Sequence, residues 1–333
     1  MSIYFLAPDQ DTPIGGVRKL YRQVDILNRS GYSASILHEK PGFRCTWFAN
    51  ATRVSYVPEV LGAGGSREDD VLVLPEIHGP GAAGLAPGVK KVIFNQNCFY
   101  TFMGFSLDAR DRRSPYLDPE VRAVMVVSED SREYLEHAFP GLRVARIHNG
   151  IDTRLFAPGG PRRRQVAFML TKNPDDALQV VNILKFRGAL EGWELAPIQG
   201  RSEADVARVL RESSVFLSFG TREGFGLPPA EAMACGCVVV GYHGMGGREF
   251  FRPEFSYPVP IGDVLSFART AERVLGEFRS APERMERMGR QAAAFIADRY
   301  SYKVEERDIV DFWDHLLAED DFAAAAPGPA PFP

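Results

Sequence analysis

The chain has 333 residues, of which 45% are hydrophobic and 25% are charged, and its formal net charge is −4. This length fits about two domains of roughly 150 residues each, and the apolar content is sufficient for two buried cores. Non-specific binding of nucleic acid needs clustered positive charge that releases phosphate counterions, so this net negative composition argues against nucleic acid as a partner.

Neither the start of the chain nor its cysteines indicates an exported or membrane-spanning protein. The opening run Met1–Pro8 is apolar without a basic leader, and Asp9 follows before a segment of membrane or signal length forms. The four cysteines, at positions 45, 98, 235 and 237, lack the spacing of metal ligands, so we expect buried thiols in a reducing compartment. The sequence therefore predicts a cytoplasmic protein whose membrane contact, if it exists, is peripheral and at the inner face.

Short apolar runs alternate with amphipathic segments through the first half of the chain. This alternation predicts β-α-β units and a parallel, doubly wound, Rossmann-like sheet over residues 1–155. The expected strands are Ile3–Ala7, Ala34–Leu37, Val71–Leu74, Val92–Phe94, Ala123–Val127 and Val144–Ile147, with helices around Val17–Leu27 and Glu129–Ala138.

A second series of the same kind follows a junction rich in Pro, Gly and Arg at residues 156–164. We therefore expect a second Rossmann-like domain over residues 156–301. Its expected strands are Gln165–Leu170, Glu194–Ile198, Val215–Ser218 and Val238–Gly241, with helices Asp175–Gly188, Ala204–Glu212, Pro229–Ala234, Val264–Phe278 and Glu283–Asp298. Residues 321–333, rich in Ala, Pro and Gly, are expected to be a disordered tail.

The segment from Ser218 to Gly236 leaves a strand and enters a helix through a glycine-rich loop. Such a loop exposes backbone N–H groups at the positive end of a helix, which suits sugar hydroxyls and phosphate oxygens. Seven residues separate Glu223 in the loop from Glu231 on the helix, so the two carboxylates can hold different parts of one elongated ligand. In parallel sheets ligands bind beyond the carboxyl ends of the strands, where this loop is expected to lie.

With these residues in view, the chain resembles glycosyltransferase family 4, the retaining enzymes of the GT-B fold. The resemblance is carried by Glu223, Glu231-Ala-Met-Ala-Cys-Gly and the valine strand that follows. It extends to Gly15-Gly16, to Asn149-Gly150-Ile151-Asp152 and to the loop from Gly244 to Glu249. The implied architecture is an α/β fold of two Rossmann-like domains facing across a cleft.

The resemblance implies specific roles for the motif residues. Glu231 would accept hydrogen bonds from the donor ribose, and Glu223 would hold hydroxyls of the transferred sugar. Backbone around the glycine loop would complete the donor cradle, and glycines in the first domain would let its backbone approach the reacting phosphate. The implied donor-binding residues are Gly15, Gly16, Lys172, Arg222, Glu223, Gly224, Phe225, Gly226, Leu227 and Glu231.

The sequence departs from the family at the basic pair that binds the diphosphate. Relatives carry an arginine and then a lysine after the first strand of the second domain, whereas Lys172 is the cation at that place here. Lys172 is therefore the expected catalytic cation beside Glu223, and Arg222 or Arg201 could supply a second charge. On the acceptor side the strand-end positions nominate Glu76, His78, Asn95, Asn97, His148 and Asn149, each of which could equally be a local cap.

A metal-independent transfer follows from these observations. An Asp-x-Asp signature after a strand is missing, so we expect neither a metal nor a cofactor, with the nucleotide-diphosphate sugar as donor substrate and a saccharide or glycoconjugate as acceptor. Family habit places the reaction in bacterial polysaccharide or glycoconjugate assembly. Three alternatives stay open: a GT-B phosphorylase, a sugar-nucleotide epimerase, and a non-catalytic donor-binding partner subunit of another transferase.

The last helix, around residues 302–320, carries an apolar stripe that includes Ile309, Phe312, Trp313 and Leu316. Relatives of the GT-B fold return their closing helix to the first domain. The resemblance therefore predicts that this helix belongs to the first domain, which would make that domain discontinuous.

Overall fold

The computed structural model describes residues 1–62 and 69–318. These residues form two compact units, of which unit 1 comprises Met1–His148 and the described residues from Glu305 onward, and unit 2 comprises Asn149–Val304. Residues 149–155, which the sequence prediction assigned to the first domain, belong to unit 2 in this division. The expected tail 321–333 and the last two residues of the expected helix 302–320 lie outside the described residues.

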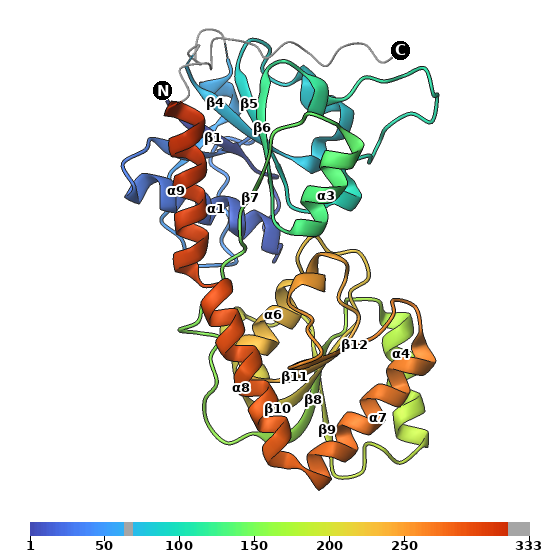
Figure 1. Cartoon of the computed structure of the whole chain (residues 1–333). Helices are drawn as coiled ribbons and strands as arrows, with labels where there is room; N and C mark the ends of the chain where they lie inside the picture. Colours follow the sequence, from blue (N-terminus) through green and yellow to red (C-terminus); the bar gives the residue numbers. More distant parts are fainter. Residues whose placement is uncertain (63–68, 319–333) are drawn as a thin grey trace. The chain divides into compact units, whose positions relative to one another are not determined.

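Unit 1 is built on a seven-stranded sheet of order β3-β2-β1-β4-β5-β6-β7 (Figure 1). Every described neighbouring pair in this sheet is parallel. Helices α1 and α9 cover one face of the sheet and α3 covers the other. The elements are β1 Ile3–Leu6, α1 Gly15–Arg29, β2 Ala34–His38, β3 Val54–Tyr56, α2 Val57–Val60, β4 Val71–Pro75, η1 Glu76–Gly84, β5 Lys90–Asn95, η2 Cys98–Tyr100, η3 Pro115–Leu117, β6 Val121–Val126, α3 Glu129–Ala138, β7 Val144–Arg146 and, from Glu305 onward, α9 Tyr302–Ala318.

The α9 helix is anchored in unit 1 by charge and by an aromatic contact. Glu305 accepts a hydrogen bond from Lys19 on α1 at 2.6 Å, and both side chains are almost completely buried. The ring of Trp313, fully buried, lies 6.3 Å from that of Phe5 on β1. The apolar stripe of α9 is thus part of the core of unit 1, because leaving these large side chains in water would forfeit their hydrophobic burial.

Unit 2 contains a five-stranded parallel sheet of order β12-β11-β10-β8-β9. Helices α4 and α7 pack on one face through Val180 and Phe267, which share a core cluster with Val166, Leu217 and Val240. Helices α6 and α8 lie on the other face (Figure 1). The elements are β8 Arg163–Met169, α4 Pro174–Phe186, β9 Glu194–Ile198, α5 Glu203–Glu212, β10 Ser213–Ser218, α6 Leu227–Ala234, β11 Val238–Gly241, η4 Gly246–Glu249, β12 Ser256–Pro258, α7 Val264–Ser280 and α8 Pro282–Arg299.

The expected strands and helices are confirmed, with ends that shift by a few residues. The sequence prediction lacked the edge strands β3 and β12 and the single-turn helix α2. Each of these strands has three residues, which is too short for an alternating pattern to emerge. The four cysteines are free and buried, as predicted.

Each sheet has one point where the winding reverses. In unit 1 this point lies between β1 and β4, and in unit 2 between β8 and β10. Loops that follow such strands diverge, so their ends leave space for a ligand at the carboxyl edge of the sheet. Gly15 and Glu76 follow the two strands in unit 1, whereas Lys172 and Glu223 follow the two strands in unit 2.

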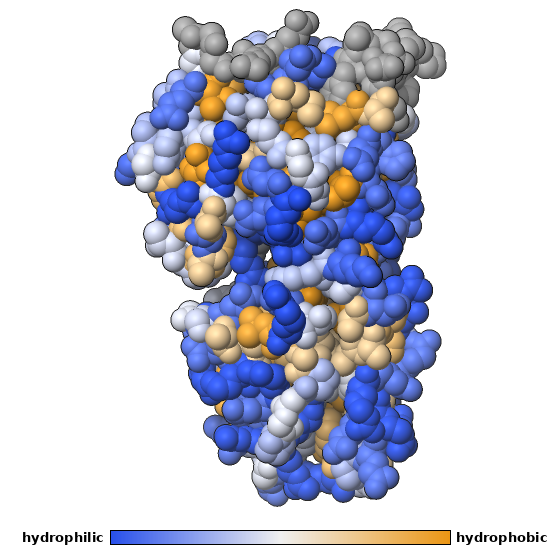
Figure 2. All heavy atoms as spheres, turned by 90° about the vertical axis from the view of Figure 1, so that its left-hand side faces the viewer, coloured by the Kyte–Doolittle hydropathy of each residue, from blue (hydrophilic) through white to orange (hydrophobic). Residues whose placement is uncertain are grey.

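Hydrophilic residues predominate on the face of the molecule shown in Figure 2. Within the described ranges, helices long and apolar enough to cross a membrane are absent.

Candidate functional site

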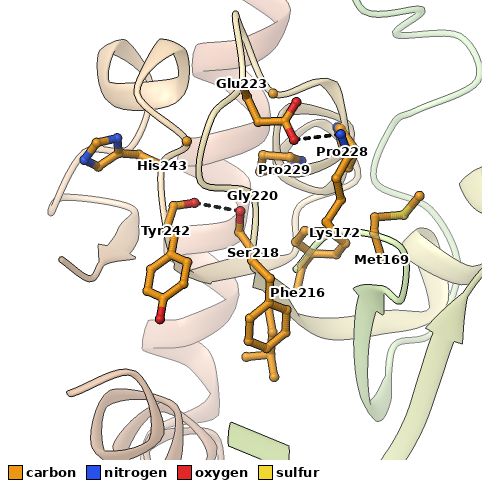
Figure 3. Close-up of a pocket in the computed structure, with 14 residues that line it drawn as sticks. Met169, Lys172, Phe216, Ser218, Gly220, Glu223, Pro228, Pro229, Tyr242 and His243 are labelled. Carbon is orange, nitrogen blue, oxygen red and sulfur yellow. Dashed lines mark hydrogen bonds and ion pairs between the residues drawn. The ribbon is translucent and has the colours of Figure 1, made fainter. Parts of the chain in front are cut away.

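A pocket lies in unit 2, at the carboxyl edge of the sheet where β8 and β10 diverge (Figure 3). Backbone of the glycine loop, polar side chains and several rings surround it. The lining residues are Met169, Lys172, Phe216, Leu217, Ser218, Phe219, Gly220, Glu223, Gly226, Pro228, Pro229, Tyr242, His243 and Gly244.

Lys172 and Glu223 meet at this pocket as an ion pair, with the lysine Nζ 2.7 Å from the glutamate Oε1 (Figure 3). The structure thus brings together the two residues that the sequence singled out as catalytic. Their side chains are 41% and 22% exposed, so solvent screens the attraction and the pair contributes little to stability. Both groups can therefore exchange partners with a ligand at small cost.

The loop that carries Glu223 is held by a second loop, which follows β11. The N–H of Glu223 donates to the carbonyl of Gly244 at 2.8 Å, and the N–H of Gly246 donates to the carbonyl of Glu223 at 3.1 Å. The two loops approach so closely that a Cβ at Gly246 would lie 2.0 Å from the carbonyl oxygen of Gly224. Only glycine fits at Gly246, and the backbone of Glu223 is fixed on both sides.

The remaining motif residues divide between support and binding surface. The ring of Phe225 is buried 5.1 Å from that of Phe250, so this side chain anchors the loop. Gly226 has φ +96° and caps α6, whose first residues are Leu227 and two prolines. Glu231 lies on α6 and is partly exposed. The predicted placement, with Glu223 in a loop and Glu231 on the helix that follows, is confirmed.

The second basic group does not lie in this pocket. Arg222 and Arg201 are exposed, and neither is among the residues that line it. Within this lining Lys172 is the single lysine or arginine.

Asn149, one of the residues predicted on the acceptor side, is almost completely buried and begins unit 2.

Three polar side chains of the pocket lining, those of Ser218, Tyr242 and His243, were absent from the predicted site. Ser218 donates to the carbonyl of Tyr242 at 2.8 Å, and the Tyr242 hydroxyl donates to Asp176 at 2.9 Å. Burial raises the pKa of Tyr242, so its hydroxyl stays protonated as a donor. His243 follows directly. Ser218 ends β10, and Tyr242 and His243 directly follow β11. This position is the sequence signal that could have identified them, because residues at that edge of a parallel sheet surround the ligand.

In unit 1 the structure brings Glu76 close to the first-domain glycines through Gln96. The Gln96 N–H donates to the Glu76 carboxylate at 3.1 Å, and the Gln96 side-chain amide donates to the carbonyl of Gly16 at 3.2 Å. Burial raises the pKa of Glu76 to about 7, and hydrogen bonds from the backbone N–H groups of Gln96 and Asn97 oppose this rise. Gly15 is the first residue of α1.

The other acceptor-side predictions have local structural partners. Asn95 is fully buried and donates to Thr101 and to Tyr116, each at 2.8 Å, so its amide holds the turn after β5. Asn97 caps η2 by accepting the Phe99 N–H at 3.2 Å. Asn95 is therefore not exposed to an acceptor, and capping occupies the carbonyl oxygen of Asn97.

Two histidines complete the predicted set in unit 1. His78 lies in η1, and burial lowers its pKa, although the nearby Glu39 carboxylate acts in the opposite direction. His148 lies 2.5 Å from Asp308 through Nδ1, and its backbone N–H donates to the same carboxylate at 3.0 Å. His148 thus ties the segment after β7 to α9.

Over the described parts of the chain there is no group of three or more His, Cys, Asp or Glu side chains that could hold an ion.

Comparison with known structures identifies the fold. Sucrose-phosphate synthase from Thermosynechococcus elongatus superposes with a TM-score of 0.68 at 12% identity, over 95% of this chain and 99% of that one. Anabaena HepE in complex with UDP gives 0.66 at 14% identity, over 95% and 100%. The chain has the GT-B fold.

Sequence comparison adds a family match in the same unit as the pocket. Residues 195–295 match the family described as glycosyl transferases group 1. An alpha-1,6-glucosyltransferase of Actinobacillus pleuropneumoniae serotype 7 (strain AP76) is 29% identical over 185 residues. That alignment spans about half of each protein, 53% of this chain and 53% of the relative. Further GT-B similarity is found with the pneumococcal O-GlcNAc transferase GtfA in complex with UDP and GlcNAc, with a TM-score of 0.67 at 11% identity over 96% and 99% of the two chains.

Proposed function

We propose that this GT-B protein is a retaining glycosyltransferase that moves a sugar from a nucleotide-diphosphate donor to a hydroxyl of a saccharide or glycoconjugate. The observation that carries the proposal is the Lys172–Glu223 pair, set in a glycine-rich pocket at the switch point of unit 2. A lysine and a carboxylate side by side match the two halves of a nucleotide sugar, because one attracts the diphosphate and the other accepts from sugar hydroxyls.

Donor binding would change the partners of this pair. A diphosphate competes with Glu223 for Lys172, since both are anionic and the lysine is 41% exposed. Glu223, released from the ion pair, then accepts hydrogen bonds from the transferred sugar. Glu231 on α6 holds the ribose, and the N–H groups at the start of α6 face the phosphates with the positive end of the helix.

The chemical step uses charge stabilisation without a metal. The bond between the anomeric carbon and the diphosphate oxygen breaks, and Lys172 stabilises the negative charge that develops on that oxygen. The acceptor oxygen attacks the same face of the sugar, and its proton passes to the departing phosphate oxygen. The anomeric configuration is therefore retained, and the backbone clamp on Glu223 keeps the sugar in position through this step.

We propose a UDP-sugar as the donor and bacterial polysaccharide or glycoconjugate assembly as the setting. HepE and GtfA, which share the fold, are described with UDP, and the relative from Actinobacillus is a glucosyltransferase. UDP-glucose is therefore the first donor to test.

The test combines binding with turnover. A thermal-shift panel of nucleoside diphosphates identifies the base, because a ligand at about 100 times its Kd stabilises the native state by about 2.7 kcal/mol. UDP release from UDP-glucose is then measured for the natural protein and for Glu223→Ala, with Glu254→Ala, an exposed glutamate elsewhere in unit 2, as the matched control. We expect the control to behave as the natural protein does. Equal turnover in all three proteins would contradict the proposal.

The second candidate is a donor-binding partner subunit without catalytic activity. It is favoured by the pocket lining, in which Lys172 is the single lysine or arginine, whereas the resemblance to family 4 implies a basic pair at this place. UDP release without an acceptor separates the two candidates. A catalytic subunit hydrolyses the donor slowly, whereas a pure binding partner binds UDP and releases none from UDP-glucose.

We further propose that unit 1 contacts the inner face of a membrane through residues 100–117. Leu107 is 102% exposed, and the segment concentrates exposed apolar side chains beside exposed arginines, of which Arg110 pairs with Asp108 and Arg113 with Asp111. This combination suits a surface of anionic lipid, into which apolar side chains insert while arginines meet phosphates. The apolar residues are Tyr100, Phe102, Met103, Leu107 and Leu117, and the arginines are Arg110, Arg112 and Arg113.

Vesicle sedimentation tests this contact. We expect binding to phosphatidylglycerol vesicles that weakens with salt and with Leu107→Asp. Leu178→Asp is the matched control, because Leu178 is 61% exposed on α4 in unit 2. Equal binding of the two variants would exclude this segment as the contact.

A further inference from the structure

The loop after β11 contains a sharp turn centred on Met245. This residue has φ 70° and ψ −70°, and the N–H of Gly246 returns to the carbonyl of Gly244 at 3.1 Å. A γ-turn of this hand is rare, and for a residue with a side chain it costs about 1–3 kcal/mol. Such a conformation persists only where the surroundings impose it.

His243 supplies one of those constraints. Its Nδ1 accepts the N–H of Met245 at 3.0 Å, and its carbonyl accepts the N–H of Gly247 at 3.0 Å. Because Nδ1 is the acceptor, the proton of the neutral imidazole lies on Nε2. The imidazole therefore holds the centre of the turn, at Met245, and the main-chain carbonyl of the same residue holds its end, at Gly247.

The other constraints come from Glu223. Gly244 accepts the Glu223 N–H at 2.8 Å and Gly246 donates to the Glu223 carbonyl at 3.1 Å, so the two groups that close the turn are the same groups that hold Glu223. A relaxed Met245 would rotate both of them away. Hydrogen bonds thus connect the His243 imidazole, through one strained turn, to the backbone of the pocket carboxylate.

We infer that His243 is a positioning residue that sets the location of Glu223 by holding the Met245 turn. The imidazole points away from the Lys172–Glu223 pair in Figure 3, so its action passes through the loop and not through contact with the sugar. The inference rests on the proposed function for its effect on turnover. The geometry of the turn itself is independent of that function.

Three substitutions test the role. In His243→Asn the side-chain carbonyl oxygen can replace Nδ1, because asparagine accepts the N–H two residues on in an Asx-turn. In His243→Gln the oxygen lies one methylene further away and misses that N–H. His243→Ala removes the acceptor. The Asn and Gln variants keep the same polar group, so a difference between them reports the hydrogen bond and not polarity.

The rate of hydrogen exchange at the amides of Met245 and Gly246 reports directly on the hydrogen bonds of the turn, whether or not the protein is active. We expect faster exchange in the Gln and Ala variants and near-natural protection in the Asn variant. Unchanged exchange in the Gln and Ala variants would overturn the inference without bearing on the proposed function.

UDP release from UDP-glucose reads the effect on Glu223. We expect kcat to fall about tenfold in the Gln and Ala variants, the loss for one hydrogen bond of about 1.4 kcal/mol, with KM for the donor changed less. In a Glu223→Ala background the same substitutions should cost nothing further, since residues that act as a unit are non-additive. Independent losses in that background, or equal losses for Asn and Gln, would overturn the positioning role. A Glu223→Ala protein as active as the natural one would refute the proposed function instead.

Discussion

Replacing Glu305 by alanine should strongly destabilise unit 1. Glu305 on α9 is 2% exposed and accepts a 2.6 Å hydrogen bond from Lys19, which is 4% exposed on α1. Arg22, one turn along α1, bonds the other carboxylate oxygen. Burial lowers the pKa of Lys19, and the Glu305 carboxylate acts against that change. Without the carboxylate, the ammonium group is left buried without its anionic partner.

The expected loss is about 3–5 kcal/mol, which is the usual cost of breaking a buried ion pair from one side. Replacing both ends by apolar residues of similar volume, Lys19→Met with Glu305→Leu, should restore much of the stability. In that case no buried ammonium group is left without its carboxylate, and the new side chains still fill the core. Arg22 also loses Glu305, but its side chain is 20% exposed and can be solvated.

Tryptophan fluorescence during urea unfolding can measure this loss in unit 1 alone. The chain has three tryptophans, and in a background with Trp47→Phe and Trp193→Phe the emission comes from Trp313, which is fully buried on α9. A decrease below about 1 kcal/mol for Glu305→Ala, the range of exposed ion pairs, would refute the reasoning. A double variant as unstable as the single one would also refute it, because unpaired charge would then not be the cause.

Three further predictions concern the sites. Glu231→Ala should raise the KM for the donor, whereas Glu223→Ala should mainly lower kcat, each by about 1.5–3 kcal/mol, and steady-state kinetics would show an error if the two effects were reversed. The pKa of Glu76 is raised from 4.5 to about 7, so native Glu76 stays protonated while the unfolded chain ionises, and stability should fall as pH rises between those values. Urea titrations should show Glu76→Gln gaining up to about 3 kcal/mol relative to the natural protein above pH 7, and a constant difference between pH 4 and 8 would contradict this. Activity should survive EDTA, and a loss that Mg²⁺ or Mn²⁺ restores would show that an ion takes part.

Local pattern in the sequence was sufficient for the two α/β units and for the strand, loop and helix that carry Glu223 and Glu231. Parallel strands buried on both faces read as continuous apolar runs, as in Val71–Pro75 and Val238–Gly241. The strand–loop–helix pattern of the segment around Glu223 and Glu231 predicted one carboxylate in a loop and the other on a helix. These features depend on residues that are neighbours in the chain, so spacing alone specifies them.

Other features depend on residues that are distant in the chain, and only the tertiary structure decided them. The edge strands β3 and β12 exist because a neighbouring strand offers hydrogen bonds, although three residues carry no periodicity of their own. Asn95 has a polar side chain of the kind that often binds ligands. Its burial against Thr101 and Tyr116 follows from the path of the chain after β5.

The clearest case is the loop from His243 to Gly247. Its glycines mark a tight turn in the sequence, but the strain at Met245 and the link to Glu223 arise only when β10 and β11 pair in parallel and bring their loops together. The parallel register Ser218↔Gly241 sets the spacing at which Gly246 can meet Gly224. The sequence determines which backbone conformations are energetically accessible to each residue. The hydrogen bonds that stabilise a strained conformation, such as that of Met245, come from the neighbouring segment.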